Sequence, residues 1–382
     1  MRKLLFLLGS VLLVIPVSAQ VPVDKALKLA IQQYKQMMTH VPDSLLPRTT
    51  NNKTGKLVTA GTDWWTSGFY PGTLWYLYEY SKDKTIRQEA RKRTTEVEKE
   101  QYNKTTHDLG FMMYCSFGNA YRLTKDPKDK HVLITSARTL CTRFNPVVGC
   151  IKSWDHGKWK FPVIIDNMMN LELLTWATKE TGDTSFAHIA RTHANTTMRN
   201  HFRPDFSSYH VIGYDPETGA VVAKNTAQGF ADSSAWARGQ AWGLYGYTMM
   251  FRETKDGAYL EQAKQIANYI IPHLPADKIP YWDFDAPDIP HAKRDASAGA
   301  VMAAALLELS QYTKNQTYWQ TAEQILQTLC SDEYLAKVGT NNNFILKHSV
   351  GHLPADSEVD VPLTYADYYF VEALLRYKKY SK

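Results

Sequence analysis

The sequence predicts an all-α protein, organised as a closed ring of six helical hairpins. Three observations predict this fold: twelve segments with helical apolar periodicity, a polar turn signature that recurs between them, and almost no alternating strand pattern. An open solenoid of helical pairs would share these features. The number of segments favours the ring, with the first and last helices closing it.

The turn signature is a Ser or Thr, then any residue, then Asp or Asn. Each copy follows one apolar helical segment and precedes another, so its Asp or Asn is expected to cap the second helix. The second segments also match, with Tyr259 and Ala263 in one and Tyr318 and Ala322 in another. Each copy therefore predicts one antiparallel hairpin. The copies occupy residues 81–83, 124–126, 181–183, 254–256 and 313–315.

Periodicity gives the limits of each helix. Leu260, Ala263, Ile266 and Ile270 line one face of a single predicted helix, for example. Two short apolar runs around residues 211–222 predict one surface hairpin. The helices are expected at 23–39, 67–81, 84–101, 107–124, 128–144, 167–181, 184–201, 233–253, 257–274, 296–313, 316–331 and 364–380.

Residues 1–19 have the pattern of a secretory signal peptide. A basic start at Arg2 and Lys3 precedes an apolar run, and Val17-Ser-Ala19 is a small-residue cleavage site. The mature chain would begin at Gln20 and form a single domain over residues 20–382. The apolar run is too short to span a membrane, and no later run is long enough. We therefore expect an exported protein with no membrane span.

Composition narrows the class of ligand. The formal charge is +6 and no stripe of Lys and Arg appears, which argues against nucleic acid. The chain has 10 Trp and 23 Tyr, many of them in predicted loops and helix starts. Aromatic faces combined with a few polar groups suit sugar rings.

Cysteine and metal signals are weak. Four Cys are sparse for an exported chain of this length, and Cys115 and Cys330 fall in helical patterns as buried thiols. The sequence does not decide whether Cys141 and Cys150 form a disulfide bond. Neither metal-ligand spacing nor a nucleotide-binding loop is present, so we expect neither a metal nor an organic cofactor.

The ring has a consequence for function. Every second helix is an inner one, and all inner helices point the same way, so their N-termini converge on one face. Acids near helix N-termini complement the helix dipole, but this does not explain the Trp, His and Arg residues beside them. The segments leading into five inner helices each carry an acid, namely Asp63, Asp108, Asp166, Asp232 and Asp295.

Asp166 is the strongest catalytic candidate. It follows the apolar run 161–165 and precedes the helix predicted at 167–181. It could be a helix N-cap, or an acid whose pKa is raised by apolar surroundings. Asp108 could be its partner, since two carboxylates in one pocket take different pKa values. Gly110 would weaken its helix by about 1 kcal/mol, which a close approach by a ligand would explain.

A second cluster lies at residues 228–242. Arg238 and Trp242 are four apart and share a helix face with Ser234. Arg beside an indole would clamp a carboxylate on a ring, and a structural salt bridge is the alternative.

Two further signals have both a functional and a structural interpretation. Gly68 and Gly72, flanked by Trp65 and Trp75, form either an aromatic approach to the site or a helix-packing surface. His210 either hydrogen-bonds a substrate or is an exposed loop residue.

Five of these stretches carry a family resemblance. They occur in order across nearly the whole mature chain, and they resemble the unsaturated glucuronyl hydrolases of glycoside hydrolase family 88. The stretches are Trp65-Thr-Ser-Gly-Phe-Tyr-Pro-Gly72, His107-Asp-Leu-Gly-Phe111, Ile165-Asp-Asn167, Ser208-Tyr-His210 and Trp236-Ala-Arg-Gly-Gln-Ala-Trp242.

The resemblance implies an (α/α)6 barrel that removes the 4,5-unsaturated uronic acid from the non-reducing end of lyase-generated glycosaminoglycan oligosaccharides. It implies that Asp166 is the general acid/base and protonates C4 of the vinyl ether, that water adds at C5, and that Asp108 is a second essential carboxylate. It assigns substrate binding to Trp65, His107, His210, Gln228, Arg238 and Trp242.

The resemblance leaves the substrate subtype open. Lys347-His-Ser349 could contact sulfate, with Ser349 as the binding residue, or could be an ordinary polar loop. Heparin-type and chondroitin-type fragments are both possible substrates. The unsaturated rhamnogalacturonyl hydrolases, which act on pectin fragments, are an alternative group. A non-catalytic oligosaccharide-binding module is a further alternative. Uptake of lyase products favours the periplasm over the medium.

Overall fold

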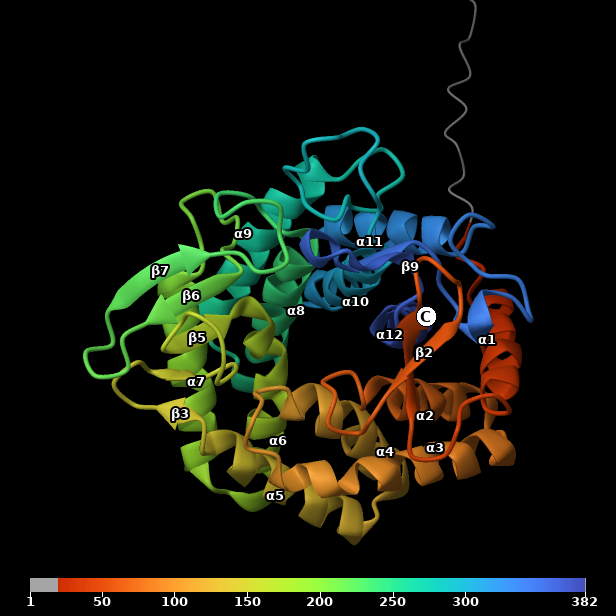
Figure 1. The fold of residues 1–382 in the computed structure, drawn as a ribbon, viewed down its shortest axis with the longest axis horizontal. Coiled ribbons are helices and arrows are strands. Elements are labelled where there is room, and N and C mark those ends of the chain that lie inside the picture. The colour runs from red at the N-terminus through yellow and green to blue at the C-terminus, as the bar shows by residue number, and fades with distance from the viewer. Residues whose placement is uncertain (1–19, 382) are drawn as a thin grey trace, which may run out of the picture.

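In the computed structural model, which describes residues 20–381, the chain forms a closed double ring of helices (Figure 1). Neighbouring inner helices contact one another all the way round, and the last one, α12, meets the first, α2. The ring is thus closed, and the open solenoid is wrong. The inner helices are α2 (Phe69–Ser81), η2 with α4 (Gly110–Gly118, Asn119–Thr124), η3 with α6 (Ile165–Asn170, Leu171–Thr181), α8 (Ala237–Thr254), α10 (Ala296–Thr313) and α12 (Thr364–Tyr380).

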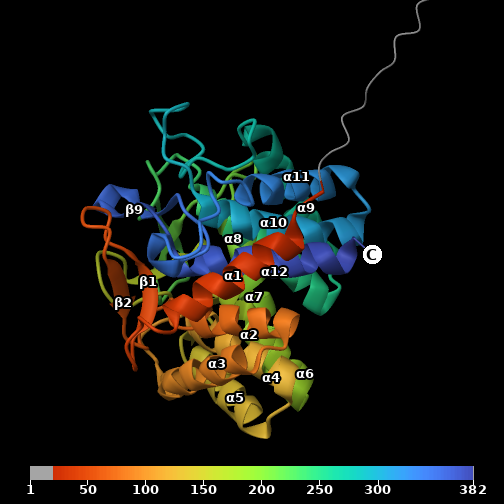
Figure 2. The ribbon, with the colours of Figure 1, turned by 90° about the vertical axis from the view of Figure 1, so that its right-hand side faces the viewer.

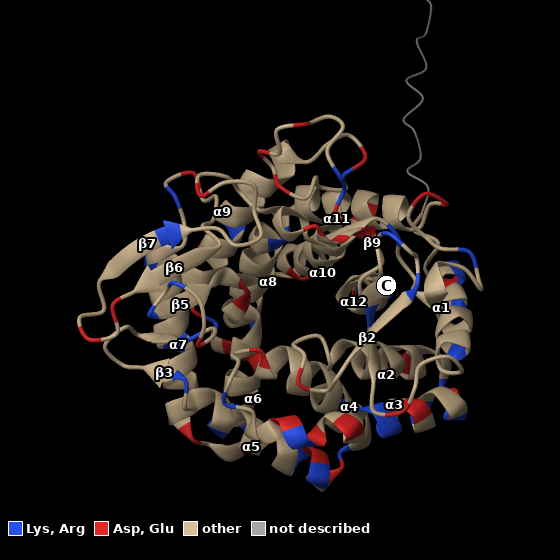
Figure 3. Ribbon diagram, in the orientation of Figure 1, with Lys and Arg blue, Asp and Glu red and all other residues tan. Residues whose placement is uncertain are grey.

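The outer ring follows the predicted hairpins. Each outer helix packs against an inner partner, and the first, α1, packs beside α12. Lys and Arg are interspersed with Glu along α3 (Figure 3). The outer helices are α1 (Val23–Met37), α3 (Lys84–Val97, continued by η1, Glu98–Tyr102), α5 (Pro127–Cys141), α7 (Thr184–Asn200), α9 (Gly257–His273) and α11 (Gln316–Leu329).

The turn signature works as a cap. The Asp83 carboxylate accepts hydrogen bonds from the backbone N–H groups of Thr85 and Ile86, at 2.8 and 3.2 Å. The residue before it, Lys82, has a left-handed conformation that ends the inner helix. The prediction is confirmed at every copy, since the same side-chain cap recurs at Asp126, Asp183, Asp256 and Asn315.

The predicted helix 107–124 begins as a π-helix, η2, before it becomes α4. Its Gly110 faces a neighbouring inner segment, because a Cβ there would lie 2.4 Å from Asn170 Cα. The backbone N–H of Phe111 also donates to Asn170 Oδ1 at 3.0 Å. The glycine therefore serves close chain packing, and the explanation by a ligand was wrong.

Short strands gather at one end of the ring, the end at which the inner helices begin (Figure 2). The predicted hairpin is confirmed as β6 and β7. A third strand, β5, pairs with β6 and was not predicted, because its residues are all buried and do not alternate. The strands are β1 (Leu46–Thr50), β2 (Leu57–Ala60), β3 (Phe144–Asn145), β4 (Cys150–Ile151), β5 (Phe161–Ile164), β6 (Val211–Tyr214), β7 (Val221–Asn225), β8 (Ser349–His352) and β9 (Ser357–Val361).

The two ends of the described chain meet in the ring. Lys378 in α12 pairs with Asp24 in α1 at 2.5 Å, and the Tyr34 hydroxyl donates to Asp367 at 3.2 Å. The predicted signal peptide, residues 1–19, lies outside the described residues. Across residues 20–381 no helix is long and apolar enough to cross a membrane. All four cysteines are free thiols, so the open Cys141–Cys150 bridge is not formed.

Gly68 offers a test of how tightly the inner helices pack. A Cβ there would lie 2.1 Å from the Phe111 carbonyl oxygen and 2.3 Å from that of Met112. We expect Gly68→Ala to lower the free energy of unfolding by about 1–3 kcal/mol, because the backbones cannot separate without loss of packing. Gly257→Ala is the control, since a Cβ at that helix start meets nothing within 4 Å. Urea unfolding curves that coincide for the two variants would contradict this expectation.

Candidate active site

Asp166 lies in η3, directly after β5, where the apolar run enters the ring. Its side chain makes no cap hydrogen bond to the following helix, so the N-cap interpretation is wrong. Its Oδ2 is buried and has no hydrogen-bond partner among the described residues. Burial raises the pKa of Asp166 to about 7; the charge of Arg238 lowers this pKa and that of Asp108 raises it. The carboxyl group can therefore hold a proton near neutral pH.

His210, at the end of the segment leading into β6, faces Asp166. Its Nδ1 accepts hydrogen bonds from the backbone N–H groups of Ala227 and Gln228, at 3.1 and 3.2 Å. The proton of the neutral ring is therefore on Nε2, which lies 3.7 Å from Asp166 Oδ2. Burial lowers the pKa of His210 well below its usual value, and the ring packs on Trp236 at 4.5 Å. His210 is thus a buried, neutral donor, and the exposed-loop interpretation is wrong.

His107 and Asp108 form the second acidic group of the site. The Thr106 hydroxyl donates to Asp108 Oδ2 at 2.7 Å, and His107 Nε2 lies 3.3 Å from Asp108 Oδ1. Burial lowers the pKa of His107. The charge of Asp108 raises the pKa of Asp166, so the two carboxyl groups lie near enough to interact electrostatically.

Arg238, in the first turn of α8, is held by the protein itself. Its Nη1 donates to Asp295 at 3.1 Å and to the Val350 carbonyl. Its Nη2 donates to the Gly351 carbonyl at 2.7 Å and to Gln228 Oε1 at 3.4 Å. Only Nε is left without a partner among the described residues. The salt-bridge interpretation therefore holds, and a bidentate clamp does not fit, because too few N–H groups remain for a ligand.

The guanidinium of Arg238 is also enclosed by rings. It lies 4.4 Å from the centre of Trp236 and 5.4 Å from that of Tyr365. A fixed positive charge is thus held beside Asp166. Gln228 joins this group through its bond to Arg238 and through its backbone N–H, which contacts His210.

Trp242 and Trp65 supply the aromatic walls. The buried Nε1 of Trp242 is near enough to Asp166 to lower its pKa, but lies outside hydrogen-bond geometry. Phe111 links the two indoles, at ring distances of 5.3 Å from Trp242 and 5.6 Å from Trp65. Trp65 also packs against Tyr365 at 5.0 Å. All these rings belong to the first two turns of inner helices or to the segments before them.

Other predicted contributors serve structure. Ser234 precedes α8, which begins at Ala237, so it does not share a helix face with Arg238; its hydroxyl donates to Asp283 at 2.7 Å. Trp75 is buried and donates to Thr94 at 2.9 Å. A Cβ on Gly72 would lie 2.5 Å from the Cys115 carbonyl. The packing interpretation thus holds for Gly72 and Trp75, whereas Trp65 lies at the site.

The three residues of the predicted sulfate-binding loop, Lys347, His348 and Ser349, have different surroundings in the structure. Lys347 is half-buried and donates to the Asp332 carbonyl at 2.9 Å, and His348 pairs with Asp360 at 2.6 Å. Ser349 is fully buried at the start of β8, beside the Val350 carbonyl that accepts from Arg238, and its hydroxyl has no partner among the described residues. Of the three, only Ser349 adjoins the site.

Sequence reasoning missed three contributors. Asp295 was seen only as an acid before a helix; it caps α10 and also holds Arg238. Trp236 and Tyr365 enclose the guanidinium, and Tyr365 carried a usable signal as the second residue of the last inner helix.

Several buried polar atoms at this end have no partner among the described residues. They mark places where a bound molecule would supply the missing hydrogen bonds. Together with the aromatic walls and the carboxyl groups of Asp166 and Asp108, they suit a polar ring that receives a proton. The atoms are Asp166 Oδ2, His210 Nε2, Arg238 Nε, Trp242 Nε1, Ser349 Oγ and Tyr365 Oη.

Comparison with known proteins identifies the family. Residues 31–382 match the profile of Glycosyl Hydrolase Family 88. An unsaturated glucuronyl hydrolase of Formosa agariphila is 51% identical over 319 residues, covering 82% of this chain and 79% of the relative. An unsaturated chondroitin disaccharide hydrolase of Streptococcus agalactiae is 32% identical, covering 94% of this chain and 92% of the relative.

Solved structures agree with this match. The crystal structure of an unsaturated glucuronyl hydrolase specific for heparin superposes with a TM-score of 0.92 at 53% identity, covering 94% of this chain and 97% of that one. The enzyme from Bacillus sp. GL1, described as responsible for glycosaminoglycan degradation, superposes with a TM-score of 0.89 at 30% identity, covering 94% and 97%. The chain therefore belongs to glycosyl hydrolase family 88, the family of the unsaturated glucuronyl hydrolases.

Proposed function

We propose that the protein hydrolyses lyase-generated glycosaminoglycan oligosaccharides, releasing the 4,5-unsaturated uronic acid from their non-reducing end. The observation that carries this proposal is the state of Asp166, a buried carboxyl group with a pKa of about 7 that faces a neutral histidine. An acid that is partly protonated at neutral pH is what protonation of a carbon–carbon double bond needs.

The proposed chemistry is hydration of a vinyl ether. Asp166 gives its proton to C4, and the electron pair of the C4–C5 double bond forms the new C–H bond. The cation left at C5 is shared with the ring oxygen and stabilised by the negative charge of Asp108. Water adds at C5 and returns a proton to Asp166. The hemiketal then opens and releases the neighbouring sugar, so no metal or redox partner enters the balance.

The remaining residues have positioning roles in this proposal. The Nε2–H of His210 would donate to the substrate or to the attacking water, because its Nδ1 is occupied by two backbone N–H groups. The Nε–H of Arg238 would face the uronate carboxylate, and its charge favours an anionic ring. Trp65 and Trp242 would cover the faces of the ring, and His107 would fix Asp108.

We further propose a preference for heparin-type fragments. This is supported by 53% identity to the enzyme described as specific for heparin, against 32% to the chondroitin disaccharide hydrolase. Ser349, whose buried hydroxyl lacks a partner, is the proposed residue for contact with the second sugar.

Loss of absorbance of the conjugated alkene tests the proposal. Purified protein is incubated with unsaturated heparin, chondroitin and rhamnogalacturonan disaccharides in separate reactions. We expect the fastest loss with the heparin disaccharide and slower loss with the chondroitin one. Loss with rhamnogalacturonan alone would replace the glycosaminoglycan assignment, and no loss on any substrate would leave an oligosaccharide-binding module.

The pH dependence of kcat/KM tests the acid. Asp166 must carry its proton to protonate C4, and its pKa is raised to about 7. Activity is therefore expected to be sustained on the acid side and to fall as pH rises through about 7. A profile that stays flat from pH 6 to pH 9, measured on the same disaccharide, would be incompatible with Asp166 as the acid.

We also propose that the enzyme acts after export, in the periplasm. The support is the charged start, apolar run and small-residue site within residues 1–19. Determination of the N-terminal residue of the protein recovered from cell fractions is expected to give Gln20 in the periplasmic fraction. An intact Met1 in a cytoplasmic fraction would contradict the proposal.

A further inference from the structure

A cavity of about 870 Å³ lies inside the ring, toward the end opposite to the candidate active site. Most of its lining comes from the later parts of the inner helices, and Gly110 and Phe111 at the start of η2 and Met169 in η3 also line it. The active site is formed where the inner helices begin. Each inner helix contributes to its lining, through Tyr76, Tyr114, Glu172, Arg252, Glu308 and Glu372 among others.

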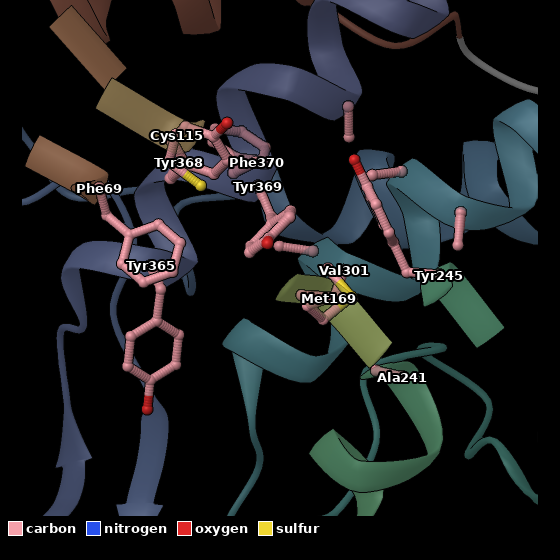
Figure 4. Packing of buried hydrophobic residues seen from close by; sticks show 14 of the residues in the cluster. Phe69, Cys115, Met169, Ala241, Tyr245, Val301, Tyr365, Tyr368, Tyr369 and Phe370 are labelled. Atoms are coloured by element: carbon pink, nitrogen blue, oxygen red, sulfur yellow. The ribbon is translucent and has the colours of Figure 1, made fainter. Parts of the chain in front are cut away.

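A layer of aromatic side chains separates the two spaces. Phe111 and Tyr369 line the cavity, and each packs against Trp242 of the active site, at ring distances of 5.3 and 5.4 Å. The side chains of Tyr365 and Tyr245 point in opposite directions (Figure 4). Phe111 and Tyr369 therefore stand between the cavity and Trp242 of the candidate active site.

The charges that line its centre do not balance. Arg252 contacts Glu308 at 2.9 Å, bonds to Glu172, and donates its Nε to Glu253 at 2.8 Å. Arg376 contacts Glu308 at 2.8 Å and Glu372 at 3.1 Å. Three lining carboxylates thus lie around two guanidinium groups, whose N–H groups also donate to Glu253, to the Ala304 carbonyl and to the Tyr245 hydroxyl. The remaining cations of the lining, Arg122, Lys125 and Lys379, are exposed.

Glu172 is the carboxylate with spare capacity. One of its oxygens accepts from Arg252, and among the described residues the other accepts no hydrogen bond. The side chain is 22% exposed, so a molecule in the cavity can reach it. Burial raises the pKa of Glu172 to about 7; Arg252 opposes this shift, while Glu253, Glu372 and Glu308 add to it. The pocket is therefore short of positive charge at this point.

Two further features of the cavity also favour the binding of a cation. Aromatic rings stand around Glu172, with Trp176 at 6.1 Å from Tyr114 and 5.7 Å from Tyr121, and ring faces attract ammonium groups. The inner helices also direct their C-terminal ends, the negative end of the helix dipole, to this side of the ring. At the rim the charge of Arg122 is already paired with Glu79, at 2.8 Å.

We propose that this cavity binds a small organic cation, with a primary ammonium group on the free oxygen of Glu172 and its carbon chain or ring against Tyr114 and Trp176. The ammonium would supply the positive charge that the three carboxylates lack. A linear diamine and a hexosamine share this chemistry. The proposal does not depend on which substrate the active site takes.

Titration calorimetry with four probes tests whether the cavity binds an organic cation. Putrescine and glucosamine carry the ammonium group, and 1,4-butanediol and glucose are their neutral counterparts. At least one amine is expected to bind, at least about tenfold more tightly than its counterpart, because only the amine forms the ion pair. The amine that binds identifies the class of ligand. Failure of both amines, or equal binding of the neutral counterparts, would overturn the proposal.

Two glutamate variants locate the site. Glu172→Gln is expected to weaken amine binding by about tenfold or more, since it removes the ion pair. Glu253→Gln is the matched control, because Glu253 contacts the same Arg252 but is not in the cavity lining, and binding should stay within about twofold. Equal losses in both variants would overturn the assignment to Glu172.

The test also has a folding control. Both variants should keep the disaccharide hydrolysis of the parent, since the aromatic layer separates Glu172 from the catalytic pocket. If Glu172→Gln fails to fold, Tyr114→Leu takes its place, and it is expected to weaken amine binding severalfold by removing one ring face. Unchanged binding in a folded Tyr114→Leu protein would then refute the site.

Discussion

Asp166→Asn is expected to reduce kcat on an unsaturated disaccharide by about 10²–10⁴-fold, the usual contribution of a positioned general acid. The amide has nearly the same shape as the carboxylic acid but cannot release a proton to carbon. Because it also carries no charge, the buried site should tolerate it. Steady-state kinetics, with substrate binding measured separately, would show a loss in kcat and not in affinity. Turnover close to that of the parent would remove Asp166 from the mechanism.

The same variant should gain stability at high pH. The pKa of Asp166 is raised from 3.8 to about 7 in the folded protein, so folding favours the protonated form. The parent therefore loses stability as pH rises from about 4 through 7, by up to about 4 kcal/mol. Asp166→Asn lacks this loss, so its stability relative to the parent should increase over that range. Denaturation at pH 4.5 and at pH 8 measures the difference.

Asp367→Asn is the matched control for Asp166→Asn. Burial also raises the pKa of Asp367 to about 7, but its oxygens accept from the backbone N–H groups of Ile345 and Leu346, each at 2.9 Å. We expect this variant to keep its turnover per folded molecule and to lose stability. A similar loss of turnover in both variants would show that the effect at residue 166 is structural.

Asp295→Asn is expected to lower the free energy of unfolding by about 3–5 kcal/mol, the usual cost of leaving one partner of a buried ion pair alone. Asp295 is fully buried, lies 3.1 Å from Arg238, and accepts from Ser297 as the cap of α10. The amide would place a donor against a guanidinium. Since Arg238 is positioned by this contact, kcat/KM should also fall by at least about tenfold.

Asp277→Asn provides the comparison for this second variant. Asp277 contacts Arg294 at the same 3.1 Å, but its side chain is 38% exposed. Water screens such a pair, so a change of no more than about 1 kcal/mol is expected. Chemical unfolding of both variants gives the answer. If Asp295→Asn were no more destabilised than Asp277→Asn, the buried pair would not be holding Arg238 in place.

The fold was largely predictable because its signals are local. A left-handed residue followed by a capping Asp or Asn, as at Lys82 and Asp83, depends on neighbours in the sequence alone. The strand β5 was missed because burial of both faces removes the alternation that identifies strands. The π-helical start of η2 was missed because it reflects packing against Asn170, far away in the sequence.

The sequence allowed the residues of the candidate site to be chosen, but not the hydrogen-bond partners of those residues. Asp166 could be chosen because the apolar run before it is visible in the sequence. The tautomer of His210 could not be predicted, because it depends on two backbone N–H groups that are 17 and 18 residues away. The hydrogen-bond partners of Arg238 could not be predicted either. Asp295 lies 57 residues away in the sequence, and the Val350 carbonyl lies 112 residues away.

The position of α12 has a consequence for folding. This helix closes the ring against α1 and α2 and carries Tyr365, although α1 and α2 stand at the opposite end of the described sequence. The barrel therefore lacks a wall in any folding intermediate in which α12 has not yet docked, and its apolar interior is then open to water. Docking of α12 on α2 is a contact of very high sequence separation, which is the kind that forms slowly.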